Sequence, residues 1–323
     1  LITIYKNKKD EQKIFDEKAN KYNQIIEMLC EKHVFEEKEP FLNFKEELLN
    51  ACVNGNVKYL DFFLQKKVYQ DGLIFALNEN NKTSAIIRCH DAKGDILIPY
   101  SIKNQSQEYI VTKIISESFQ YNTTINSIQF EDNSAILEID ENAFSSSFLT
   151  KIMLPSKLSK LSQNVFDDCS ELKSIDFQAQ SELKIIDKNA FIYSELESIF
   201  IPASVTDLVE GWCNNTDHLF NIVIDENNEC FKYIEDSMII GKSNKDKENY
   251  DVLCFVRRDI EQIIIPSYIK RISSYAFDEC TRLKNIEFQE NSELESIGEY
   301  SFYNTIIEYI SITSSVKEIK RGC

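Results

Sequence analysis

A strand-like unit that recurs every 23 or 24 residues constrains this chain more than any other feature. The first apolar residues of the Ile-x-apolar cores are Ile128, Ile152, Ile175, Ile199, Ile222, Ile263, Ile286 and Ile310. The successive intervals are 24, 23, 24, 23, 41, 23 and 24 residues. A period of about 20 to 29 residues is the signature of a leucine-rich solenoid, in which each coil supplies one strand and one helical or 3₁₀ turn. We therefore expect an α+β repeat fold, a solenoid of about eight coils with parallel strands.

A second recurrence lies between the strand cores, where Ile or Leu is followed five residues later by Phe. The pairs are Ile114/Phe119, Ile139/Phe144, Leu161/Phe166, Ile186/Phe191, Ile272/Phe277 and Ile297/Phe302. We interpret this Phe as the large side chain that fills each coil. Three residues later the chain must turn back, and a small or polar side chain there can satisfy a buried amide. Cys169 and Cys280 occupy this position, so we interpret them as structural thiols.

One coil departs from the pattern, and the long interval follows it. By register, the Phe position falls on Cys213, and Trp212 takes the small position before it. Two strand-like runs, residues 238–240 and 252–256, then flank a polar stretch. This arrangement predicts a hairpin inserted near residues 226–260. We expect residues 263–265 to pair with residues 222–224 as neighbouring parallel strands in spite of the insertion.

The chain ahead of the repeats divides into two parts. Residues 1–72 contain an apolar pattern near helical spacing, and the stretch "LLNACVNGNVKYLDFFL" resembles a single ankyrin unit. We expect residues 1–72 to form a small helical cap, residues 73–114 a β-rich lead-in, and residues 115–323 the repeats.

Composition excludes several classes of function. The net charge is −17, from 53 acidic and 36 basic residues, which disfavours nucleic acid and anionic lipid as partners. No apolar run approaches the roughly 18 residues that a transmembrane helix needs. The nine Cys include no Cys-x-x-Cys pair, and the three His stand in no recognisable constellation. We therefore expect no catalytic, cofactor-binding or metal site.

Candidate binding residues lie on the strands, between the two residues that point inward. These outward positions are Gln129, Met153, Asp176, Phe200, Val223, Ile264, Glu287 and Ser311. Large apolar side chains have no packing role on an outward face, so a row of them suggests a contact surface. The predicted partner site on the concave face comprises Met153, Asp176, Phe200, Val223, Ile264 and Glu287.

The repeated units, with their Ala-Phe-x-x-Cys-x-x-Leu core and Pro-x-x-Val closure, resemble the BspA-like (Treponema-type) leucine-rich repeats. Within that family, residues 73–323 are similar to the trichomonad surface antigens. The resemblance implies a non-catalytic adhesion or protein-binding module with a protein or glycoconjugate ligand. Two alternatives are an intracellular ankyrin and leucine-rich scaffold and a hydrolase built on the solenoid. The resemblance places the protein at the cell surface, whereas the lack of a signal-peptide layout and the unpaired Cys residues favour the cytoplasm.

The C-terminal residues carry a further expectation. Ile319 stands at the position that precedes the filling Phe by five residues, so the next Phe is due just beyond Cys323. An array that stopped there would expose an open apolar end, whereas terminal repeats usually carry a polar outer face. We therefore expect the sequence to be a fragment that is truncated within the repeats.

Overall fold

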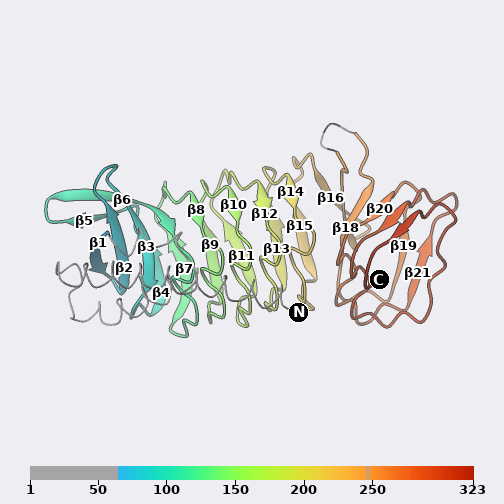
Figure 1. Ribbon diagram of the computed structural model, residues 1–323, viewed down its shortest axis with the longest axis horizontal. Coiled ribbons are helices and arrows are strands. Elements are labelled where there is room, and N and C mark those ends of the chain that lie inside the picture. The colour runs from blue at the N-terminus through green and yellow to red at the C-terminus, as the bar shows by residue number, and fades with distance from the viewer. Residues whose placement is uncertain (1–64, 245, 247) are drawn as a thin grey trace, which may run out of the picture.

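The computed structural model describes residues 65–323 apart from 245 and 247. Within these residues the chain forms 23 strands and no helix. The predicted α+β class is therefore wrong for this part of the chain, which is a β-solenoid of about ten turns rather than about eight. Figure 1 shows the strands stacked side by side along the long axis of the molecule.

The long sheet runs through the first part of the solenoid. Its order is β15-β13-β11-β9-β7-β4, and its strands are β4 (Gly94–Ile98), β7 (Ile125–Phe130), β9 (Lys151–Leu154), β11 (Ser174–Phe177), β13 (Ser198–Ile201) and β15 (Asn221–Ile224). All neighbours are parallel, and the predicted register is confirmed where Ile128 pairs with Ile152 and Ile199 with Ile222. These isoleucines are buried and their neighbours face outward, because side chains alternate across a strand.

Short strands form the opposite wall of each coil. The wall strands of the first part are β8 (Glu138–Ile139), β10 (Lys160–Leu161), β12 (Ile185–Ile186) and β14 (Asp207–Leu208). Between the two walls, buried phenylalanines form a column, as predicted. The ring centroids of Phe119, Phe144, Phe166 and Phe191 are 5.0, 5.3 and 5.7 Å apart in sequence order.

The turns that carry these phenylalanines are not helical because their backbone groups bond to the next coil. The N–H of Phe119 donates to the carbonyl of Ala143 at 2.8 Å, and equivalent bonds follow in later coils. In an α-helix the same groups would bond along their own chain. Each turn also holds two residues with positive φ, such as Asn142 (58°) and Ser146 (53°). Left-handed residues cannot continue a right-handed helix.

A six-stranded sheet precedes the regular coils. It runs β1-β2-β3-β6-β5, with β8 paired to β6, and its further strands are β1 (Lys66–Gln70), β2 (Leu73–Asn78), β3 (Thr83–Cys89), β5 (Ser101–Asn104) and β6 (Gln107–Ile114). The helical cap expected for residues 1–72 lies outside the described residues up to position 64. At its described end the chain forms the strand β1, so the helical assignment is wrong there. In the described part of the chain, no helix is long and apolar enough to cross a membrane.

The second part of the solenoid begins with the insertion. Its wall sheet runs β16-β17-β18-β20-β22-β23, with β16 (Phe231–Ile234), β17 (Met238–Gly241), β18 (Val252–Val256), β20 (Arg271–Ile272), β22 (Ser296–Ile297) and β23 (Glu318–Ile319). The strands β16, β17 and β18 are antiparallel, and β18 and the later strands are parallel. On the other wall, among the residues that the structure describes, only β19 (Gln262–Ile265) and β21 (Asn285–Phe288) pair.

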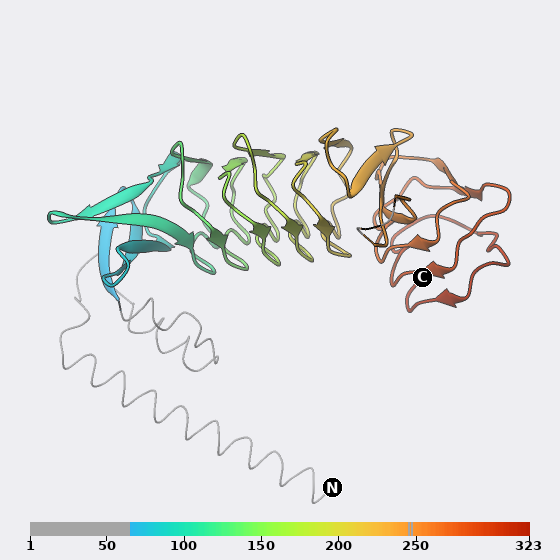
Figure 2. The same ribbon diagram turned by 90° about the horizontal axis from the view of Figure 1, so that it is seen from above.

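The prediction that residues 263–265 pair with residues 222–224 is therefore wrong. Within the described residues, β15 pairs only with β13, and β19 pairs only with β21. The insertion places two strands, β16 and β17, beside β18 in one wall, and the long sheet receives none. The long sheet is therefore interrupted between β15 and β19. Figures 1 and 2 both show the coils before and after the insertion as separate stacks.

Trp212 connects the two stacks in the interior. Its ring centroid lies 6.1 Å from that of Phe191 and 5.8 Å from that of Phe255, which belongs to β18. Trp212 therefore continues the aromatic column in place of the missing Phe, while Cys213 is also buried. The hydrophobic core nevertheless divides into two clusters within the insertion, whose strands give Ile239 and Phe255 to the first cluster and Met238, Ile240, Leu253 and Val256 to the second.

Candidate functional site

The outward row of the long sheet is the first candidate surface. Register places Met153 beside Asp176 and Phe200 beside Val223. Phe200 is 38% exposed and Val223 is 57% exposed, although inward neighbours such as Ile199 are buried. The sheet thus holds two large apolar side chains in water at its β15 end, where they contribute little to the core.

Asp176 does not act as a free charge in this row. Its carboxylate lies 2.8 Å from the Nζ of Lys151, which is on the neighbouring strand β9. A hydrogen bond and the charge of Asp176 raise the pKa of Lys151. Both side chains are about half exposed, so the pair shapes the surface more than it stabilises the fold.

The row extends one strand further than the sequence analysis placed it. Leu97 on β4 pairs with Gln129 on β7 and is 57% exposed. The signal was present in the stretch "ILIPYSI", which has the same Ile-x-apolar-Pro ending as "IFIPASV" and "IIIPSYI". The irregular distance to Ile128 concealed it, because a β-bulge and the hairpin of β5 and β6 lie between the two coils.

Ile264 and Glu287 form a separate pair. They are neighbours on β19 and β21, and the structure does not join them to Met153, Asp176, Phe200 and Val223 in one sheet. Ile264 is 55% exposed. The six predicted residues therefore all face outward, but they lie on two surfaces that the insertion separates.

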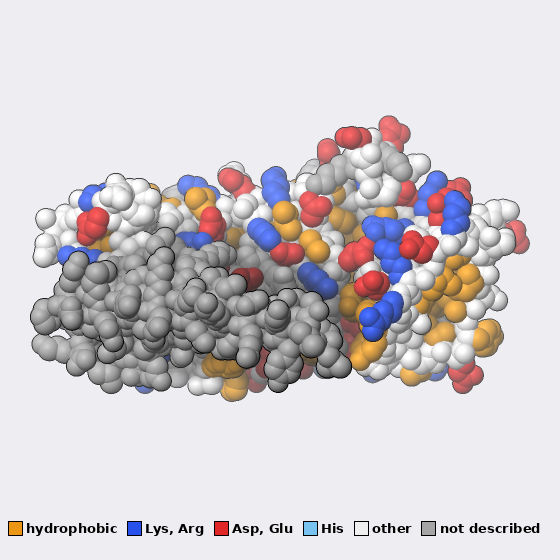
Figure 3. Space-filling model, viewed as in Figure 1, with side chains coloured by type: hydrophobic (Ala, Val, Ile, Leu, Met, Phe, Trp, Pro, Cys, Tyr) orange, Lys and Arg blue, Asp and Glu red, His pale blue; other side chains and the backbone are white. Residues whose placement is uncertain are grey.

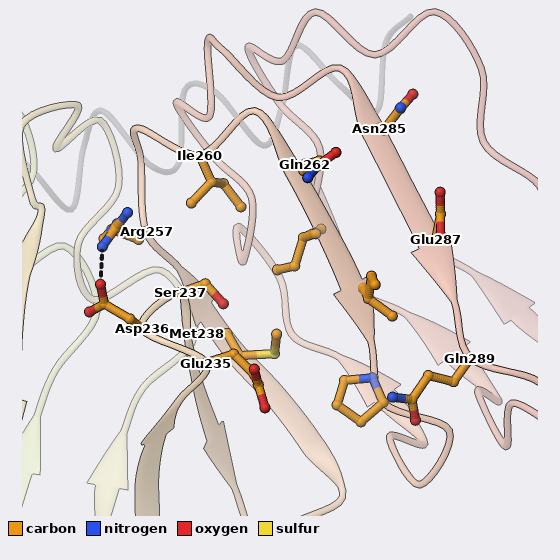
Figure 4. A pocket seen from close by; sticks show the side chains of 13 residues that line it. Glu235, Asp236, Ser237, Met238, Arg257, Ile260, Gln262, Asn285, Glu287 and Gln289 are labelled. Carbon is orange, nitrogen blue, oxygen red and sulfur yellow. Dashed lines mark hydrogen bonds and ion pairs between the residues drawn. The ribbon is translucent and has the colours of Figure 1, made fainter.

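A groove of about 660 Å³ lies beside this second pair. Its walls are the β16–β17 turn, which includes Glu235, Asp236 and Ser237, and the outer face of β19 and β21 (Figure 4). Met238, Ile260 and Ile263 give the groove an apolar floor. On the face shown in Figure 3, acidic and basic side chains intermingle over the β18–β20 region, and hydrophobic side chains gather toward the β21 end.

Arg257 holds the turn wall of the groove in place. Its backbone N–H donates to the carbonyl of Ser237 at 2.7 Å. Its guanidinium donates to the carboxylates of Asp236 at 2.8 Å and Asp259 at 2.7 Å. These bonds connect the β16–β17 turn to the segment that leads into β19, so the groove has a defined width before any ligand binds.

A buried cluster joins the two stacks but offers no reactive nucleophile. Arg258 is fully enclosed, its Nη1 donates to the carbonyl of Ala276 at 3.1 Å, and its Nη2 lies 3.7 Å from the Sγ of Cys213. Burial raises the pKa of Cys213 to about 12 in spite of the guanidinium, and that of Cys280 to about 11. A thiol with such a pKa is protonated at neutral pH and is a poor nucleophile.

One group of side chains has a donor set suited to a metal. Single ligand atoms of Glu195, Asp217 and His218 lie within 4.8 Å of one another. The Nδ1 of His218 is 3.1 Å from Glu195 and 2.9 Å from Asp217, and Lys173 also lies 3.4 Å from the Glu195 carboxylate. All four side chains are exposed by more than a third, so we interpret the group as a surface network of charges.

Comparison with known proteins supports the repeat assignment. Residues 100–219 and 248–323 match the family described as BspA type leucine rich repeat region, in six copies. The interruption between the two matched ranges contains β15 and the strands β16 and β17 of the insertion. A search of curated proteins gave no match.

Three solved structures share the fold at low sequence identity. The pneumococcal vaccine antigen PcpA is 22% identical with a TM-score of 0.66, and the match covers 78% of this chain and 71% of that chain. A leucine-rich repeat protein from Bacteroides ovatus is 21% identical with a TM-score of 0.56, and the match covers 78% of this chain and 60% of that chain. A leucine rich cell surface protein from Faecalibacterium prausnitzii is 20% identical with a TM-score of 0.50, and the match covers 79% of this chain and 76% of that chain.

Proposed function

The chain belongs to the BspA-type leucine-rich repeat family, and on that premise we propose that it is a non-catalytic module that binds a protein or glycoconjugate ligand. The contact surface is the outer face of the long sheet, centred on Phe200 and Val223. Met153 and Asp176 extend it toward the N-terminal coils.

The observation that carries this proposal is the exposure of large apolar side chains where the fold does not need them. Leu97, Phe200 and Val223 share one face of one sheet, and each is more than a third exposed. Isolated apolar residues on a surface are ordinary, whereas a row at fixed register resembles the centre of a protein interface. The ion pair of Lys151 and Asp176 adds a polar contact within the row.

Adhesion at a cell surface is the finer form of the proposal. It is supported by the resemblance of residues 73–323 to trichomonad surface antigens. The names of two structural neighbours, a vaccine antigen and a cell surface protein, point the same way.

Site-specific photo-crosslinking tests the proposal. A benzoylphenylalanine replaces Phe200, and the control replaces Phe148, which is 49% exposed but lies outside the sheet. Binding through the sheet face predicts discrete crosslinked species on intact cells from position 200 and none of the same species from position 148. Competition with unlabelled protein removes them, and competition with a Met153→Ser/Phe200→Ser/Val223→Ser variant does not. The same products from both positions, or none from position 200, contradict the proposal.

A further inference from the structure

The strand β19 presents an unpaired backbone edge. The carbonyls of Glu261 and Ile265 accept hydrogen bonds from Asn285 at 3.3 Å and Gln289 at 3.0 Å, so these groups face β21. Backbone groups alternate in direction along a strand, and those of Gln262 and Ile264 therefore point the opposite way. Among residues 65–323 as described, no strand pairs with this edge.

The groove runs along this edge. It is lined by Gln262, Ile263 and Ile264 on the strand side and by the turn from Glu235 to Met238 on the other (Figure 4). No described strand pairs with both β15 and β19, so the long sheet is interrupted on this side of β19. A strand laid along this edge meets the backbone donors and acceptors of Gln262 and Ile264 with its own backbone.

Charge indicates which kind of strand the groove suits. Arg257 is engaged by Asp236 and Asp259. Glu235 and Glu287 also line the groove, and within the described part of the chain neither takes part in an ion pair. The whole chain carries a net charge of −17. Both the groove and the longer-range field thus favour basic side chains.

We propose that the groove beside β19 binds an extended, basic peptide segment of a partner protein, which adds to the two-stranded β19–β21 sheet as a third strand. Main-chain hydrogen bonds to Gln262 and Ile264 supply the common part of the affinity. Lysine or arginine side chains of the peptide reach Glu235 and Glu287, and apolar side chains contact Met238 and Ile260. This site is distinct from the face that carries Phe200 and Val223.

Titration of the full chain with backbone-modified peptides tests the proposal. The probe is a fluorescent peptide of about ten residues that alternates Lys and Val, and binding is measured by anisotropy. Two derivatives carry N-methyl groups, one on the Val amides and one on the Lys amides. Alternate amides of a strand face opposite sides, so one derivative loses at least about tenfold in affinity and the other changes by less than about twofold. Equal losses in both derivatives, or no saturable binding of the parent peptide below about 1 mM, overturn the proposal.

Protein variants locate the site independently. Ile264→Pro removes an edge N–H that makes no bond to β21, and it weakens binding of the parent peptide by at least about fivefold while circular dichroism stays unchanged. Glu235→Gln/Glu287→Gln weakens binding by about threefold or more at low salt, whereas Glu171→Gln, at a distant exposed site, does not. Phe200→Ser/Val223→Ser binds the peptide normally, which separates this site from the proposed function. If Ile264→Pro does not fold, the comparison of the two N-methylated peptides still tests the proposal.

Two outcomes identify a different occupant. An alternating Glu and Val peptide that binds as tightly as the Lys and Val peptide refutes the charge argument. Self-association of the protein that excludes the peptide, and that Glu235→Gln/Glu287→Gln does not alter, assigns the groove to a second copy and overturns the proposal.

Discussion

Replacing Phe191 by Ala tests whether the aromatic column holds the coils together. Phe191 is fully buried, and its ring lies between those of Phe166 at 5.7 Å and Trp212 at 6.1 Å. Truncating a buried Phe costs about 3–5 kcal/mol, because transfer and cavity terms add. Aromatic neighbours contribute about 0.5–1.5 kcal/mol per pair beyond area, so we expect a loss of about 4–5 kcal/mol.

Phe302→Ala is the matched control for this change. Phe302 occupies the same position of a later coil, but it is only partly buried, and its ring centroid lies 4.9 Å from that of Phe277. We expect this variant to lose about 1–2 kcal/mol, because the removed side chain is already in contact with water. The difference in unfolding free energy between the two variants measures how much a fully buried ring with aromatic neighbours on both sides contributes.

Two measurements report on the change in the affected coil. Trp212 is the chain's single tryptophan and contacts the substituted ring, so its emission follows the local loss of packing. Hydrogen exchange resolves the free energy coil by coil, which matters because long arrays do not unfold in one step. Protection should fall most across residues 161–225 and much less across residues 263–297, which belong to the other hydrophobic cluster. Unchanged protection across residues 161–225, or equal losses in Phe191→Ala and Phe302→Ala, refutes the reasoning.

Three further predictions concern the surface, the thiols and the junction. Met153→Ser/Phe200→Ser/Val223→Ser should leave the melting temperature within a few degrees of the parent, because outward positions change stability by about 0.5 kcal/mol or less each; a large drop would mean that these residues pack. In alkylation at pH 8 followed by mass spectrometry, exposed Cys323 should react, whereas Cys169 and Cys213 should not until the protein unfolds. Burial raises the pKa of each of these two thiols to about 12, so the reactive thiolate is absent at pH 8. Arg258→Ala should cost about 3–5 kcal/mol in denaturant titrations, because it empties an enclosed position beside Asp278, and a loss below about 1 kcal/mol would contradict this.

The sequence period was sufficient to predict the register of the coils. In seven of the eight predicted cores the Ile lies on a strand and is buried, and a shift of one residue would turn this apolar set to water. The eighth prediction is wrong, because the structure has no strand at Ile310 and that residue is only partly buried. Ile152 therefore had to pair with Ile175, and Ile297 also pairs with Ile319, although Ile319 is 53% exposed. That pairing confirms the position assigned to Ile319, and the expectation that the chain continues beyond Cys323 stays a prediction.

The type of turn could not be obtained from the same pattern. The spacing of Ile and Phe by five residues suits one winding of a helix as well as a wide turn. A helix is excluded because backbone N–H and C=O groups of the turn form hydrogen bonds with the neighbouring coil, whereas in a helix they would bond within their own segment. Asn142, Asn164 and Asn189 are the available clue, since asparagine is enriched among residues with positive φ.

Trp212 shows how a change in side-chain volume can conceal the register. Trp212 stands at the backbone position that Ala190 has in the previous coil. Its carbonyl accepts the N–H of Phe191, just as the carbonyl of Ala190 accepts the N–H of Phe166. Its indole is large enough to reach into the aromatic column that Cys213 leaves unfilled. Alignment by residue type alone therefore assigned the backbone correctly and missed the side chain that fills the coil.

The placement of the insertion determines which surfaces of this solenoid are available for binding. A regular array covers the edge of each strand with the next coil, so only its outer face can recognise a partner. Here β16 and β17 enlarge one wall while the long sheet gains no strand, and β19 is left with a backbone edge beside a walled groove. Exposed edges promote unwanted pairing and are usually shielded. The β16–β17 turn, fixed by Arg257, restricts access to this edge without covering it. An edge that is restricted in this way is suited to selecting one extended segment, and the interval of 41 residues is its only trace in the period of the sequence.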